Sequence, residues 1–71
     1  MTEGNLMSEA KIRVEEELGD LQGKRVKLDL FLGSEKAKTL SEPAYSLLHA
    51  QYHAMTAYAG LLAARLEIWN D

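Results

Sequence analysis

The chain has 71 residues, a net charge of −3 and no cysteine. A chain this short is one domain at most, and it is marginally stable alone unless a disulfide, a metal or self-association supports it. The missing cysteines exclude disulfides and cysteine-bound zinc, so self-association is the support that is left. The acidic balance disfavours DNA or RNA as a partner, so an anionic ligand has to be met by a local cluster of basic side chains.

The hydropathy of the chain excludes a membrane partner. No apolar run approaches the roughly 18 residues of a membrane span. The polar start of the chain lacks the apolar segment of a secretory signal. The sequence therefore predicts a cytoplasmic protein.

The first half of the chain predicts a long amphipathic helix over about residues 8–32, after a loose tail of residues 1–7. Ser8 is the expected N-cap. Apolar residues then recur at intervals of four and three, the spacing of one helix face, and Arg25 occupies the one skipped position. This row consists of Val14, Leu18, Leu21, Leu28 and Leu32.

Two glycines interrupt this first helix. Gly19 and Gly23 each weaken a helix by about 1 kcal/mol relative to Ala. Two interpretations follow: the helix breaks near residues 19–20, or a neighbouring backbone approaches closely at the glycines.

A second helix is predicted over about residues 42–69. Gly33 is a suitable stop for the first helix, and residues 34–40 form a short polar connection. Ser41 is the expected N-cap, and Pro43 falls in the first turn, where a missing N–H costs nothing.

This second helix carries two adjacent apolar rows. Residues of the first row step by four and three without a miss: Leu48, Tyr52, Met55, Ala59, Leu62, Leu66 and Trp69. The second row is Ala44, Leu47, Gln51, Ala54, Tyr58, Leu61, Arg65 and Ile68.

A connection this short makes the two helices antiparallel neighbours, so the predicted fold is an all-α helical hairpin forming a single domain over residues 1–71. A hairpin has one internal seam and covers only one of the two rows. The remaining apolar strip marks a protein interface, which predicts an obligate homo-oligomer.

The sequence offers little support for catalysis or for a metal. His49 and His53 are spaced to share a metal ion, but no third ligand stands nearby on the helix, so interface or surface histidines are the favoured interpretation. No nucleophile motif appears, and Glu15, Glu16 and Glu17 have the character of a solvated run. The prediction is a non-enzymatic protein without a cofactor.

Basic residues are more informative. Lys24, Arg25 and Lys27 cluster in the first helix, and Arg65 stands in an otherwise apolar row. A solvated face is the usual role of a lysine cluster. Burying Arg65 without a partner would be costly, so it requires either an acid such as Glu15 or a bound anion.

The expected register of the hairpin separates these cations. Lys24 would lie near Gln51, and Arg65 near Ala10. Lys24 and Arg65 are then roughly 20 Å apart along the axis. They belong either to two sites or to one site assembled across subunits.

Both helices carry residues at spacings that resemble those of a known family. The second helix has Leu47-Leu48, Gln51, Met55, Tyr58, Leu62 and Arg65, and the first has Lys24-Arg25-Val26-Lys27-Leu28 followed by Phe31-Leu32. This combination resembles the small hairpin of phage-encoded anti-CBASS sponges and their anti-Thoeris relatives, over about residues 12–68.

The resemblance implies a compact helical oligomer, typically a hexamer. It implies that the protein sequesters cyclic di- or trinucleotide messengers, or cyclic ADP-ribose isomers, without cleaving them, so that bacterial effectors are not activated. Lys24 would contact cyclic dinucleotide phosphates, and Arg65 would serve a separate trinucleotide site. Arg25, Val26, Lys27 and Tyr58 complete the expected binding residues. The alternative is a non-catalytic adaptor that binds a host or phage protein through its exposed apolar row.

Overall fold

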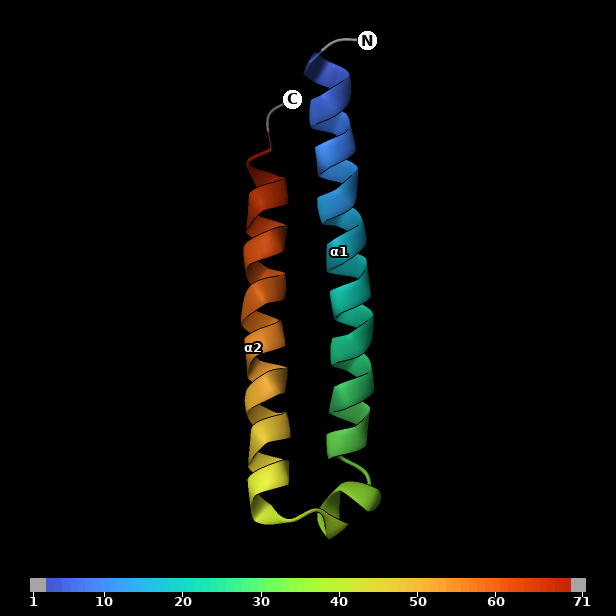
Figure 1. Cartoon of the computed structure of the whole chain (residues 1–71), viewed down its shortest axis with the longest axis vertical. Helices are drawn as coiled ribbons and strands as arrows, with labels where there is room; N and C mark the ends of the chain where they lie inside the picture. Colours follow the sequence, from blue (N-terminus) through green and yellow to red (C-terminus); the bar gives the residue numbers. More distant parts are fainter. Residues whose placement is uncertain (1–2, 70–71) are drawn as a thin grey trace.

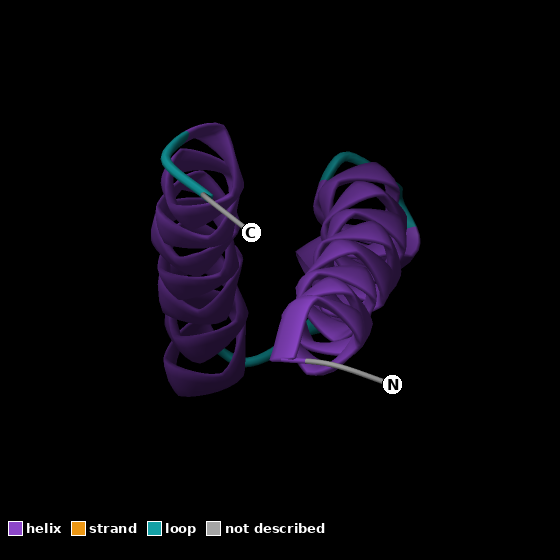
Figure 2. Ribbon diagram, turned by 90° about the horizontal axis from the view of Figure 1, so that it is seen from above, coloured by secondary structure: helices purple, strands orange, loops and turns teal. Residues whose placement is uncertain are grey.

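The computed structural model describes the backbone of residues 3–69 and the side chains of residues 9–69. Two α-helices run antiparallel, α1 (Glu3–Leu32) and α2 (Glu42–Glu67), and a short 3₁₀ helix, η1 (Lys36–Thr39), lies between them (Figure 1). The molecule is a rod with extents of 54 × 15 × 15 Å. Seen from above, the described residues form two helices side by side with loops at their ends and no strand (Figure 2). The predicted all-α hairpin is confirmed.

The first helix starts earlier than the sequence predicts. α1 already includes Glu3, so Ser8 lies inside the helix and is not its N-cap. The loose tail expected over residues 1–7 is therefore wrong from Glu3 onward, while Met1 and Thr2 lie outside the described residues.

The glycines of α1 do not break it. The helix is continuous through Gly19 and Gly23. A Cβ built on either residue meets nothing within 4 Å. Within the protomer, neither a break nor the close approach of a neighbouring backbone explains them.

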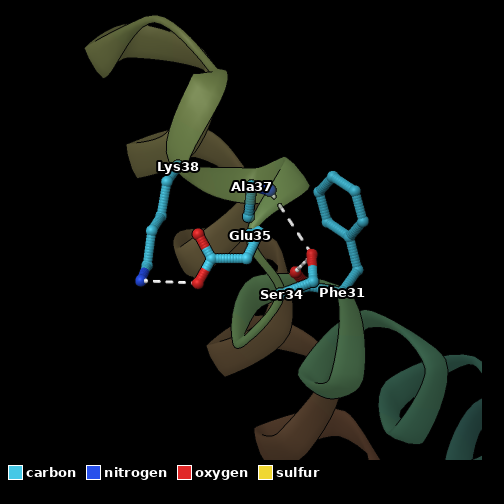
Figure 3. A network of polar contacts seen from close by, with 5 residues as sticks. All are labelled: Phe31, Ser34, Glu35, Ala37 and Lys38. Carbon is cyan, nitrogen blue, oxygen red and sulfur yellow. Dashed lines mark hydrogen bonds and ion pairs between the residues drawn. The ribbon is translucent and has the colours of Figure 1, made fainter.

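The connection between the helices is held by its own polar contacts (Figure 3). Ser34 Oγ donates to the carbonyl oxygen of Phe31 at 2.6 Å and accepts from the Ala37 N–H at 3.4 Å. Lys38 Nζ lies 3.3 Å from Glu35 Oε1. Ala37 is fully buried. This turn reverses the chain at the point that the sequence predicts.

The second helix matches its prediction closely at the start. It begins after Ser41, which has the extended backbone of an N-cap but makes no capping hydrogen bond with its side chain, and Pro43 falls in the first turn. The helix ends at Glu67, two residues earlier than expected, where Ile68 is the C-cap and its N–H donates to the Ala64 carbonyl. Neither described helix combines the length and apolar character needed to cross a membrane.

The two rows of α2 have different environments. Every residue of the first row is buried or half-buried: Leu48, Tyr52, Met55, Ala59, Leu62, Leu66 and Trp69. They face the row of α1 that contains Val14, which is likewise buried. The second row is exposed apart from Ala44, and Leu47, Leu61 and Ile68 are 70%, 63% and 81% exposed. One row closes the hairpin, and the other leaves an apolar strip on its surface.

Candidate functional site

A groove of about 450 Å³ opens along one flank of the hairpin. We call it the Lys24 groove. Its lining residues come from α1, except for one from α2: Arg13, Glu16, Glu17, Asp20, Leu21, Lys24 and Tyr58. Residues of α1 that are three and four apart share a helix face, so this lining follows directly from the helix period. Tyr58 belongs to the exposed row of α2, and the groove therefore runs beside the apolar strip.

Tyr58 is fixed to α1 by a hydrogen bond. Its hydroxyl donates to the carboxylate of Glu17. That bond raises the pKa of Tyr58 above its ordinary value, and partial burial and the negative charge of Glu17 act in the same direction. The positive charge of Arg65 lowers the same pKa. The hydrogen bond to Glu17 thereby holds the Tyr58 side chain at the edge of the groove.

Arg65 is exposed and lies two helical turns beyond Tyr58, roughly 10 Å along the axis of α2. Its positive charge lowers the pKa of the Tyr58 phenol, although less than Glu17 raises it. Among the acids whose side chains are described, none lies within salt-bridge distance of Arg65. The ion pair with Glu15 that the sequence left open is therefore not formed.

Arg25, one of the predicted binding residues, lies in the seam between the helices. It is half-buried, and its guanidinium carbon lies 6.0 Å from the centre of the Tyr52 ring. Nη1 donates to the Tyr52 hydroxyl at 3.4 Å, whereas the buried Nε has no partner. This contact explains how an arginine occupies the skipped position of an apolar row.

The remaining predicted residues divide between the flanks. Lys27 is exposed three residues after Lys24, so the helix period directs it to the same side of α1. Val26 is 52% exposed. Two residues turn a helix through about 200°, so Val26 does not share a face with Lys24.

The histidine pair does not form a metal centre by itself. The rings of His49 and His53 are 6.2 Å apart. Among the described residues, no three His, Cys, Asp or Glu side chains are grouped closely enough to hold a metal ion.

The charged residues of the groove other than Lys24 are those that sequence reasoning missed. Glu17 was grouped with a solvated run, and neither Arg13 nor Asp20 was selected. The available signal was their spacing, since Arg13, Glu17, Asp20 and Lys24 follow one another at intervals of four and three. What the spacing does not tell is that Tyr58 lies opposite this row.

Comparisons with known proteins give one result. No curated protein and no solved structure matches the chain. The model of the Sequestin family matches residues 8–68, which is most of the chain and includes both helices. The chain therefore belongs to the Sequestin family, the phage anti-CBASS and anti-Thoeris cyclic nucleotide sponges.

Proposed function

We propose that this protein is a phage immune-evasion sponge that acts in the host bacterial cytoplasm. It binds cyclic di- or trinucleotide messengers of anti-phage signalling, or related cyclic nucleotides, and holds them without cleaving them. The observation that carries the proposal is the Lys24 groove, which brings Lys24 and the Tyr58 ring to one flank of a Sequestin hairpin. Lys24 supplies a point charge for a phosphate, and a tyrosine ring offers a stacking surface for a base.

The charge of the groove supports a site that is shared between copies of the chain. Two basic and three acidic side chains line it. The groove of one protomer therefore has a net negative charge and attracts an anionic ligand only near Arg13 and Lys24. Within one protomer Lys24 and Arg65 are roughly 20 Å apart along the rod, so one small ligand does not reach both. A guanidinium binds phosphate through paired hydrogen bonds. A second copy, docked on the apolar strip, brings additional cations such as Arg65 to the ligand.

Isothermal titration of the full chain against a panel of cyclic di- and trinucleotides tests this function. We expect binding at micromolar concentration or tighter for at least one of them. Lys24→Ala or Arg65→Ala should weaken it about tenfold or more, because each removes a charge-assisted hydrogen bond of about 1.5–3 kcal/mol. Lys36→Ala, in η1, is the matched control and should bind normally.

The fate of the ligand separates a sponge from an enzyme, and the variants separate it from an adaptor. Chromatography of the ligand released by heating the complex should return it intact, whereas a linear product would indicate cleavage. Absence of binding to every cyclic nucleotide tested would contradict the sponge. An adaptor would keep its function in Lys24→Ala and Arg65→Ala and lose it when the apolar strip is made polar.

A further inference from the structure

A second pocket, of about 270 Å³, opens on the other flank of the hairpin, near the connection. We call it the ring pocket. Its lining is Asp29, Leu32, Gly33, Tyr45, His49, Tyr52 and His53. It shares no lining residue with the Lys24 groove. The function proposed above makes no use of it.

Four aromatic rings follow one another along this side of α2. The centres of the Tyr45 and His49 rings are 4.8 Å apart with their planes at 56°. The Tyr52 ring meets the His53 ring edge to face at 5.6 Å. Tyr45, His49 and Tyr52 are half-buried, so the rings are supported from behind while part of each stays accessible. Arrays of this kind bind flat ring systems by stacking, and every nucleobase has such a face.

The polar character of the ring pocket favours a hydrogen-bond donor over an anion. Asp29 is the one Asp, Glu, Lys or Arg side chain among its lining residues. The pocket also lies at the C-terminal end of α1, where the helix dipole is negative. The Arg25 guanidinium contacts Tyr52 from the seam between the helices but does not line the pocket. The Asp29 carboxylate, which does line it, repels a phosphate and attracts N–H groups. The Lys24 end of the Lys24 groove, by contrast, carries a positive charge that attracts a phosphate.

We propose that the ring pocket binds the guanine base of a guanine nucleotide. Guanine carries two neighbouring donors on one edge, the N1–H and the 2-amino group, and both fit the two oxygens of the Asp29 carboxylate. Adenine offers a single donor beside an acceptor nitrogen, which a carboxylate repels. Because the planes of the Tyr45 and His49 rings are tilted by 56°, the base stacks on one of them and meets the edge of the other. The proposal stands on the lining of this pocket and does not depend on the Lys24 groove.

Guanosine, which has no phosphate, is the probe that isolates this pocket. The full chain is titrated in EDTA while the ring resonances of Tyr45, His49 and His53 are followed by nuclear magnetic resonance. Guanosine should shift these resonances. Inosine lacks the 2-amino group, and adenosine lacks both matched donors. Each should therefore bind at least about tenfold more weakly than guanosine.

Variants place the effect on Asp29. Asp29→Asn keeps the shape of the side chain but replaces one acceptor with a donor, so guanosine should bind about tenfold more weakly and lose its advantage over inosine. Glu67→Gln, at the far end of α2, removes one negative charge elsewhere and should leave guanosine binding unchanged. Circular dichroism checks that both variants keep the helical fold.

The outcomes separate this pocket from the proposed function. Equal binding of guanosine and adenosine, or no binding of either, overturns the pocket even if cyclic nucleotides bind in the titration described above. Histidine shifts that appear only after Zn²⁺ is added also overturn it. Guanosine binding that depends on Asp29, without binding of any cyclic nucleotide, supports the pocket and contradicts the sponge.

Discussion

Tyr58 is the residue that connects the two helices at the Lys24 groove. Its hydroxyl donates to Glu17 across 41 positions of sequence. A carboxylate acceptor stabilises the neutral phenol and not the phenolate. The orientation of the ring over the groove therefore depends on Glu17, although Glu17 itself repels a phosphate.

The Tyr58 contact predicts a change at alkaline pH. Because its pKa is raised in the folded protein, the folded state holds the phenolic proton more tightly than the unfolded state does. The stabilisation is fully present below the ordinary tyrosine pKa of about 10 and is lost as the pH rises through the folded value. Ultraviolet titration of tyrosinate should show one group ionising late. Glu17→Gln should lower that pKa, and Tyr58→Phe should remove the late transition; an unchanged titration curve in Glu17→Gln would contradict the contact.

Arg25 predicts an unusual effect on stability. Its guanidinium is half-buried against Tyr52 with one buried nitrogen unpaired. Replacing a poorly satisfied buried ion with an apolar side chain is often neutral or stabilising. Arg25→Leu should therefore raise the free energy of unfolding by about 1 kcal/mol, measured by urea denaturation. Tyr52→Phe is the control for the long hydrogen bond, and a loss of stability in Arg25→Leu would show that this bond contributes more than its geometry indicates.

At the scale of the elements, the hydropathy period was sufficient to predict both helices and to predict that only one of the two rows of α2 is covered within the hairpin; which row is buried became clear only in the structure. It did not predict the start of α1, because residues 3–7 do not continue the apolar row and Ser8 is a residue type that often begins a helix. The break near Gly19 did not occur either. Leu18 and Leu21 are half-buried on the inner face on either side of Gly19, and this packing outweighs its low helix propensity.

The site was predictable only in part, for a geometric reason. The resemblance named Lys24 on one helix and Tyr58 on the other, and the groove contains both. Their meeting depends on how each helix is rotated about its own axis. The sequence period fixes the inner faces, but the contacts at the flanks, such as Glu17 with Tyr58, depend on side chains from both helices. Val26 was predicted as a binding residue from the resemblance, although the helix period already places it off the Lys24 face.

The helix glycines give a test at this scale. In the protomer, a methyl group at Gly19 or Gly23 meets open space. Gly19→Ala and Gly23→Ala should each raise the free energy of unfolding by about 1 kcal/mol through helix propensity. Gly33→Ala lies outside the helix and should gain less. A fall in the melting temperature of either helix variant would reveal a neighbouring copy packed against the glycine.

For the whole molecule, the exposed row of α2 predicts self-association. Leu47, Leu61 and Ile68 expose large apolar side chains along one flank, and few residues are fully buried in the hairpin itself. Leu61→Glu should reduce the mass measured by light scattering toward that of a single chain. Thr56→Glu, also exposed on α2 but on the flank away from the apolar strip, is the control and should keep the wild-type mass. A wild-type protein that is already monomeric at micromolar concentration would contradict the prediction.

The start of α1 and the end of α2 lie at the same end of the rod, opposite the connection (Figure 1). This arrangement makes the order of the helices along the chain interchangeable. A circular permutant that joins the two chain ends by a short linker and opens the chain at η1 would keep the seam, the apolar strip and both pockets, since all of them arise from helix packing and not from connectivity. Such a permutant would present new chain ends beside the ring pocket and leave the Lys24 groove undisturbed.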